Sequence, residues 1–178
     1  MKIRWQRFNI YLLVTLAAAV VCGCQSTAEK QSKKQLSTLR LHLEASPDGS
    51  KANEAIPVYR AHPVMVTVEK APFLTEGDVA EARVVDSEGS FVLRIRFTHA
   101  GAALLEQCTA ENRGRKIAVF CQFGEGLQEY RWLGAPIITH HISDGVFVFT
   151  PDASREETEE IALGLNNVAK KVVTWIDK

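Results

Sequence analysis

Few side chains in this sequence have the types and spacing that catalysis or metal binding needs. His140 and His141 are adjacent, and imidazoles are common metal ligands. On a strand, however, neighbouring side chains point to opposite faces, so this pair cannot easily chelate one ion. Glu125, Glu129 and Asp144 fall in predicted turns, where carboxylates are usually solvated or capping groups. The sequence has no nucleophile elbow, phosphate-binding loop or dinucleotide fingerprint, and we predict no catalytic residue, no metal site, no cofactor and no enzymatic activity.

The N-terminus has the three parts of a secretory signal. Lys2, Arg4 and Arg7 form a basic region, an apolar run follows from Phe8 to Val21, and small residues come next. A helix that spans a bilayer needs roughly 20 apolar residues, and this run is shorter. The segment therefore favours a signal peptide over a permanent anchor.

Residues 21–24, Val-Cys-Gly-Cys, resemble the lipobox of bacterial lipoproteins. The resemblance implies a signal peptide over residues 1–23, cleavage after Gly23, and a thiol on Cys24 that carries lipid with fatty acids such as palmitate. Several acyl chains hold a protein stably on a membrane, whereas one chain binds only marginally. In enterobacterial-type sorting, Asp after the lipidated cysteine retains lipoproteins in the inner membrane, so Gln25 favours the outer membrane. The alternative is an ordinary signal peptide, or an uncleaved anchor, in which Cys24 is incidental.

Charge and composition limit the classes of partner that this chain could have. The full chain is formally neutral, and residues 1–23 hold three basic residues and no acidic ones, so their removal leaves a net charge of about −3. Such a small value argues against nucleic acid, or an anionic membrane surface, as a partner attracted by bulk charge. A content of 46% hydrophobic and 24% charged residues is typical of one globular domain.

Two cysteines remain for the folded part. Cys22 leaves with the signal peptide and Cys24 carries lipid, so Cys108 and Cys121 are left. They could form a disulfide in an oxidising periplasm. The predicted positions, one on a helix and one on a strand, favour two buried thiols.

The mature chain is predicted to have a tether and one domain. Residues 24–35 start with the lipidated Cys24 and are polar, without large apolar side chains, so they are predicted to form a flexible tether. Residues 36–178 are predicted to form a single domain. Leu39, Leu41 and Leu43 alternate with polar residues, which predicts a half-buried strand. Prolines flank a second strand predicted over residues 63–69, as is typical of an edge strand.

The later elements predict an α+β fold. Residues 75–78 resemble a capping box and predict a short helix to Ala82, followed by a β-hairpin over residues 83–97. A helix is predicted over residues 98–113, with a stripe of Gly101, Leu104, Leu105 and Cys108. Strands over residues 116–123, 130–142 and 146–149 predict an antiparallel meander, and Ser154 caps the last helix. We expect a mixed or antiparallel sheet of about six strands with about three helices packed on it, ferredoxin-like in character.

Short stretches over residues 58–171 resemble the periplasmic domain of the protein-export membrane proteins SecD and SecF. The matching stretches keep the family's order and spacing. They are Phe73-Leu74-Thr75, Asp78-Val79, Ala82, Ile95-Arg96-Phe97, Gly101, Thr109, Asn112, Gly114-Arg115, Ile117-Ala118-Val119, Ala135-Pro136-Ile137-Ile138, Ile142-Ser143, Gly145, Phe149-Thr150, Glu156-Glu157 and Ile161-Ala162. The resemblance implies a domain in the periplasm that contacts an emerging preprotein. SecD and SecF each have six transmembrane helices that couple export to protons, and this sequence shows none of them, so the chain is not expected to drive export by itself.

The resemblance and the lipobox together predict a lipid-tethered periplasmic module that binds proteins or peptides in export without catalysis. The partner is expected to be an unfolded or translocating protein, or Sec components, and the strand over residues 63–69 is a candidate docking edge. Trp132 beside Tyr130 is a second candidate patch, although an aromatic on a strand more often packs in the core. The alternative function is that of a structural or self-assembling envelope lipoprotein.

Overall fold

The computed structural model describes residue 32 and residues 34–176, the last five of them as helical backbone. The chain divides into two compact units, Met1–Lys34 and Gln35–Lys178, and the second holds the fold. The predicted signal peptide, residues 1–23, and Cys24 lie outside the described residues, as does most of the predicted tether. Gln35 belongs to the folded unit, because its carbonyl accepts a hydrogen bond from Asn167 Nδ2 at 3.0 Å.

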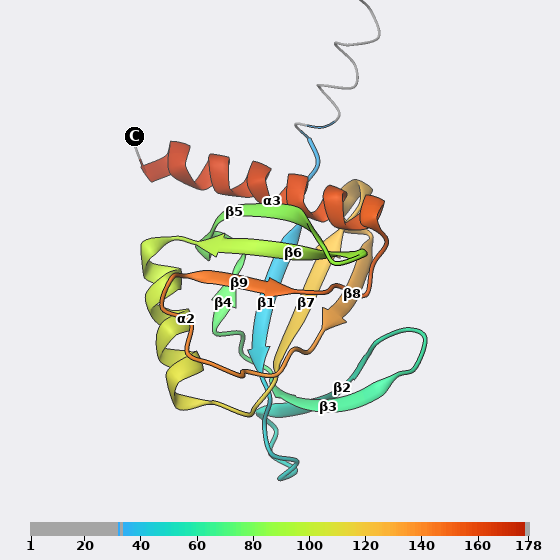
Figure 1. Ribbon diagram of the computed structural model, residues 1–178, viewed down its shortest axis with the longest axis vertical. Helices are drawn as coiled ribbons and strands as arrows, with labels where there is room; N and C mark the ends of the chain where they lie inside the picture. The colour runs from blue at the N-terminus through green and yellow to red at the C-terminus, as the bar shows by residue number, and fades with distance from the viewer. Residues whose placement is uncertain (1–31, 33, 177–178) are drawn as a thin grey trace, which may run out of the picture. The chain divides into compact units, whose positions relative to one another are not determined.

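The strands of the described residues form three antiparallel sheets (Figure 1). Sheet A has the order β4-β1-β7-β8, with β4 at Leu74–Thr75, β1 at Thr38–Leu43, β7 at Ile117–Phe123 and β8 at Glu129–Gly134. Sheet B is the hairpin of β2 at Asn53–Val58 and β3 at Val64–Glu69. Sheet C has the order β5-β6-β9, with β5 at Val79–Ser87, β6 at Ser90–Phe97 and β9 at Val146–Phe149.

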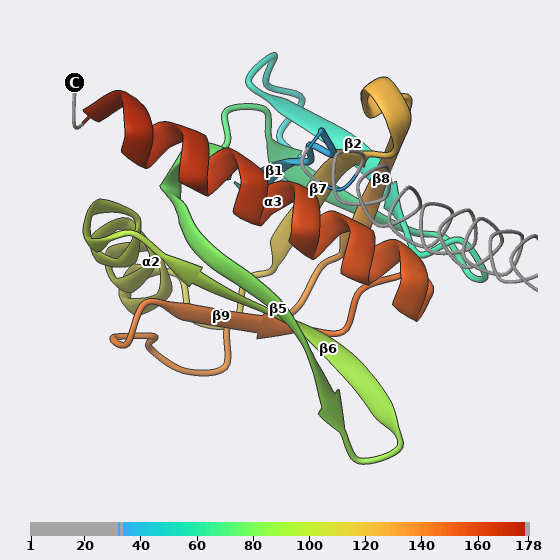
Figure 2. The ribbon, with the colours of Figure 1, turned by 90° about the horizontal axis from the view of Figure 1, so that it is seen from above.

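Two α-helices of the described residues close the space between sheets A and C. α2 spans His99–Glu111 and α3 spans Arg155–Ile176. Thr98 caps α2 by accepting a hydrogen bond from the Gly101 N–H, at 3.2 Å. Ser154 and Glu157 form the predicted capping box of α3, with hydrogen bonds of 2.7 and 3.1 Å. Seen from above, α3 runs along the gap between the two sheets (Figure 2). Short 3₁₀ turns occupy Glu76–Asp78 and Glu125–Leu127.

The main core lies between sheet A and sheet C. Alternate residues of each strand enter it, as the period of a β-strand requires, and α2 and α3 add their apolar faces. Leu39, Leu93, Leu105, Phe123, Leu133, Ile161 and Leu165 are all fully buried there.

Sheet B covers the opposite face of sheet A and creates a second, smaller core. Its members are Ile56, Val58, Val66, Val68, Ala118 and Ala135, with Trp132 packed against them. His42 is buried on this face, donates from Nδ1 to the Glu69 carbonyl at 2.8 Å, and packs in a T-shaped arrangement with the Trp132 ring. β1 is therefore buried on both faces towards its end, and not half-buried as its alternation predicts.

Several predicted elements are confirmed. β1, the β5–β6 hairpin, α2, β7, β9 and α3 lie where the sequence places them. The second predicted strand is β3, and its hairpin partner β2 was not predicted, because Pro57 interrupts the pattern of that strand. The fold is α+β, but its strands are divided among three antiparallel sheets, so a single ferredoxin-like sheet of about six strands with three helices is wrong.

Other predictions fail for reasons visible in the pairing. Residues 79–82 begin β5 and form no helix, because Val79 and Ala82 pair with β6. The expected meander is wrong, since β9 pairs with β6 and not with β8. The strand expected over residues 130–142 ends at Gly134, and Ile137 forms only an isolated bridge with Lys116. In α2, Thr109 is buried and Leu104 is exposed, so the apolar stripe is narrower than predicted.

Candidate peptide-contact site

β9 is an edge strand of sheet C, and its pairing with β6 determines which of its backbone groups are free. Ile95 lies opposite Phe147, and just beyond the strand the Phe97 N–H donates to the Gly145 carbonyl at 3.0 Å. Hydrogen-bonded and non-hydrogen-bonded pairs alternate along an antiparallel ladder, so Phe147 and Phe149 bond to β6. Val146 and Val148 therefore direct their N–H and C=O groups away from β6.

One of these outward groups already has a partner. The Val146 N–H donates to Asp144 Oδ1 at 3.1 Å. Within the described part of the chain, the N–H and carbonyl of Val148 have no hydrogen-bond partner. The Val148 side chain is 47% exposed. The edge of β9 is thus accessible in both backbone and side chain.

A groove of about 540 Å³ opens beside this edge. One wall is β9, and the other is the segment of residues 136–144. Hydrogen bonds anchor this segment to the Ile117 N–H of β7 and to the Arg115 carbonyl just before β7. We call this space the β9 groove. Its volume lies within the range of about 300–1,000 Å³ that is typical of ligand sites. Its apolar lining is Ile117, Pro136, Ile137, Ile138, Ile142, Val146, Phe147 and Val148.

Other sheet edges of the described residues are met at single points by other groups or lack a donor there. The Asn166 side chain of α3 bonds to both the N–H and the carbonyl of Ala82 on β5, at 2.9 and 2.8 Å. The Asp152 N–H donates to the Leu133 carbonyl of β8. The Ala45 N–H donates to the Thr67 carbonyl of β3. β2 carries Pro57, which has no N–H to offer.

The predicted edge strand over residues 63–69 is an edge in part. β3 pairs with β2 on one side, and on the other side it meets Ala45 and, through Val68, Glu44. Val64 and Met65 remain 51% and 63% exposed. This end of the hairpin projects from the body (Figure 1).

The adjacent histidines line the β9 groove but serve different partners. His141 Nε2 lies 3.2 Å from Glu106 Oε1, and His140 Nδ1 lies 3.0 Å from Thr139 Oγ1. Among the residues described, no three metal-ligating side chains gather in one place. The groove is therefore an apolar contact surface with polar residues along its rim.

Tyr130 and Trp132 do not form one patch. Trp132 packs against the second core and against the Phe120 ring, with centroids 5.1 Å apart. Tyr130 is 72% exposed. The expectation that Trp132 packs in the core is confirmed, and Tyr130 is left as an isolated exposed aromatic.

Cys108 and Cys121 are free thiols in the structure. Burial raises the pKa of the Cys108 thiol to about 11, and burial likewise raises the pKa of Cys121. A thiol reacts through its thiolate, and both side chains stay protonated at neutral pH. Neither cysteine has the properties of a nucleophile.

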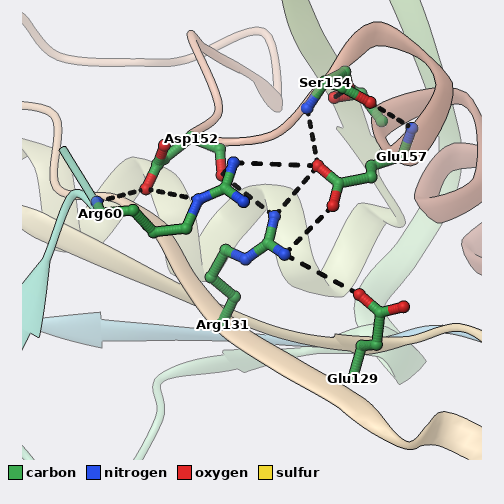
Figure 3. A network of polar contacts seen from close by, with 7 residues as sticks. Arg60, Glu129, Arg131, Asp152, Ser154 and Glu157 are labelled. Atoms are coloured by element: carbon green, nitrogen blue, oxygen red, sulfur yellow. Dashed lines mark hydrogen bonds and ion pairs between the residues drawn. The ribbon is translucent and has the colours of Figure 1, made fainter.

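A cluster of charged side chains ties the hairpin of sheet B to the start of α3 (Figure 3). Arg131 of β8 donates from Nη1 and Nη2 to both carboxylate oxygens of Glu157, each at 3.1 Å. Arg131 also donates to the Asp152 carbonyl, and the Arg60 N–H of the hairpin turn donates to Asp152 Oδ2 at 2.7 Å. The Arg131 side chain is 17% exposed and that of Glu157 is 27% exposed. Such a bidentate, partly buried pair contributes more than a surface ion pair, so this cluster holds the layers together.

This cluster predicts an acid-sensitive fold. The hydrogen bonds from Arg131 lower the pKa of Glu157 from its ordinary value of 4.5. A carboxyl with a depressed folded-state pKa stabilises the fold above its unfolded pKa, and the contribution disappears as the pH falls through the folded value. We expect the free energy of unfolding to fall below about pH 4.5, and to fall less in Glu157→Gln. Urea unfolding at pH 7 and pH 3 measures this.

A matched substitution tests the origin of that pH dependence. Glu54→Gln removes an exposed carboxylate of β2 and should leave the pH dependence of unfolding unchanged. If both variants keep the full acid sensitivity of the parent chain, the Arg131–Glu157 pair is not its source.

Comparison with known proteins identifies the family. Residues 53–169 match the family model described as SecDF, P1 head subdomain. The chain belongs to the SecDF P1 head family. Over 97 residues, 54% of its length, it is 35% identical to the protein translocase subunit SecDF of Thermus thermophilus. That match spans 12% of the translocase subunit.

Solved structures of SecDF share the fold of this P1 head domain. One, of SecDF as a membrane component that enhances protein export, superposes with a TM-score of 0.55 at 21% identity, over 82% of this chain and 69% of the other. Another, of SecDF in a super-membrane-facing form, gives a TM-score of 0.54 at 21% identity, over 82% of this chain and 21% of the other. The predicted resemblance to SecD and SecF is thus confirmed. None of the described helices is long and apolar enough to cross a bilayer.

The β9 groove was not predicted from the sequence. Residues 146–149 were expected to be the last strand of a meander and to pair with the strand before them, whereas β9 pairs with β6. The signal that points to an edge is the short length of β9 together with Gly145, whose φ of 67° favours glycine and marks an abrupt start of the strand.

Proposed function

We propose that this P1 head domain is a periplasmic, lipid-tethered module that binds segments of other proteins during export, without catalysis. Cys24 carries the lipid in this proposal, and Gln25 favours the outer membrane. The partner is an unfolded or translocating protein, presented by or together with Sec components.

The observation that carries the proposal is the open β9 edge beside an apolar groove. An unfolded chain offers partners for this surface, because its own backbone groups are unpaired and its apolar side chains are exposed. Membership of the P1 head family and the similarity to a SecDF that enhances protein export support a role in export. The free thiols and the separated histidines give no support to an enzymatic function.

Two valines of sheet C make a matched cross-linking test. Val148 borders the β9 groove, and Val85 of β5 is similarly exposed, at 40%, on a strand that does not line the groove. A photoreactive amino acid at position 148 of the full chain, expressed in cells, should form adducts with exported proteins, whereas position 85 should form few. Equal adducts at the two positions, or none at either, would contradict the proposal.

The tether is tested in the same cells. Labelled palmitate should enter the parent chain and not the Cys24→Ser variant. Equal labelling of the two chains would remove the lipid anchor from the proposal and leave the binding function to be judged by the cross-links.

A further inference from the structure

We propose that the bound segment adds to sheet C as a new strand on β9, and that the site selects apolar segments that carry an acidic residue. This inference rests on the proposed binding function and specifies how that function is performed. It concerns the backbone of Val146 and Val148 and the outward face of sheet C.

The free backbone groups of β9 define the pairing. The N–H and carbonyl of Val148 and the carbonyl of Val146 point away from β6, while the Val146 N–H is held by Asp144. An extended segment beside β9 can donate to both carbonyls and accept from the Val148 N–H. Buried backbone groups need such partners, and an open edge is the usual template for strand addition.

The two faces of the added strand would meet different surroundings. Side chains of a strand alternate between faces. One set would enter the β9 groove beside Phe147 and Ile138, which are both buried. The other set would lie next to Val146 and Val148 on the outward face of sheet C. Both faces favour apolar residues at the centre of the segment.

The charge of the outward face favours an acidic residue in the segment. The register of sheet C places Arg83 opposite Arg94, and Glu81 opposite Arg96, on this face. Glu81 pairs with both Arg83 and Arg96. Arg94 lies opposite Val148 and has no ion pair among the described residues. With Asp144 at the start of this edge, three guanidinium groups face two carboxylates. Arg94 is therefore the group that attracts a carboxylate and repels a lysine.

A proline substitution separates strand addition from ordinary apolar contact. Val148→Pro removes one outward N–H that β6 does not use, and proline is tolerated at such positions of edge strands. The probe is a labelled nine-residue peptide of alternating Val and Thr with one central Glu, and fluorescence anisotropy with the full chain in detergent gives its Kd. Val148→Pro should weaken binding about tenfold, whereas Val148→Ala, which keeps the N–H, should weaken it less than about threefold. Circular dichroism and the thermal midpoint check that each variant is folded.

Modified peptides provide a second measurement that needs no variant of the protein. N-methylation of alternate residues removes half of the N–H donors of the peptide. Two such peptides are possible, methylated at the odd or at the even positions, and one of them should also bind about tenfold more weakly. Replacing the central Glu with Lys should weaken binding to the parent chain, and Arg94→Glu should reverse that preference.

The outcomes distinguish the two levels of the proposal. If the peptide binds and neither Val148→Pro nor N-methylation changes its Kd, strand addition is wrong. If Arg94→Glu does not alter the preference for Glu over Lys, the acidic selectivity is wrong. If the peptide does not bind and position 148 forms no cross-link with an exported protein, the proposed function itself fails.

Discussion

Replacing Gly164 with alanine should destabilise the fold by about 2–3 kcal/mol. Gly164 lies on the face of α3 that contacts the chain before β1. A Cβ there would collide with Ser37 Oγ and would lie 2.6 Å from the Ser37 nitrogen and 2.7 Å from the Leu36 carbonyl carbon. Alanine favours a helix over glycine by about 1 kcal/mol, but the collision involves backbone atoms that must move. Urea unfolding followed by circular dichroism measures the difference.

Two controls give that prediction its specificity. Leu163→Ala shortens a partly exposed neighbour on the same helix and should cost less than about 1 kcal/mol. The Ser37 hydroxyl is buried without a hydrogen-bond partner among the described residues, so Ser37→Ala alone should be nearly neutral. The double variant Ser37→Ala, Gly164→Ala should stay destabilised, because the backbone contacts remain. Full recovery in the double variant would show that only the hydroxyl is in the way.

Replacing Asn166 with alanine should cost about 2–4 kcal/mol. The Asn166 amide accepts from the Ala82 N–H and donates to the Ala82 carbonyl, at 2.9 and 2.8 Å. Ala82 is 1% exposed, so water cannot replace both partners, and each unsatisfied buried group costs about 1–3 kcal/mol. The same unfolding measurement tests this prediction.

An asparagine elsewhere provides the comparison. Asn53 makes hydrogen bonds that are exposed to solvent, and Asn53→Ala should cost less than about 1 kcal/mol. Amide hydrogen exchange gives a second check, because the Ala82 amide should exchange faster in Asn166→Ala. A loss of stability no larger than that of Asn53→Ala would mean that α3 holds β5 through apolar packing alone.

Local signals predicted the elements well. Thr98 and Ser154 each cap a helix through hydrogen bonds within one turn, and such contacts depend only on neighbouring residues. The turn of the β5–β6 hairpin is equally local, since Gly89 supplies a φ of 81°. The capping box at Thr75 is also present, with its N–H bonded to Asp78 Oδ2 at 2.9 Å, but the residues after it continue as a strand because β6 pairs with them.

The partners of the strands could not be predicted in the same way. Val146 and Arg96 pair across 50 residues, and nothing near either residue specifies that choice. The burial of His42 depends on sheet B, whose strand β2 is concealed by Pro57. The candidate site follows from these distant pairings, because the register with β6 decides which backbone groups of β9 point outward. The sequence resemblance to SecD and SecF therefore predicted the family, while the site needed the structure.

A pull on residue 35 in the direction of β1 acts first on the segment that α3 holds at Ser37 and Gly164, and then on β1 itself. β1 lies between β4 and β7, and its residues from Thr38 to Leu43 pair with Gln122 to Ile117. Hydrogen bonds between antiparallel strands are perpendicular to the strands, so this force loads every pair of the ladder together, in shear, and does not open them one at a time. The N-terminal side of the fold is thus built to withstand tension.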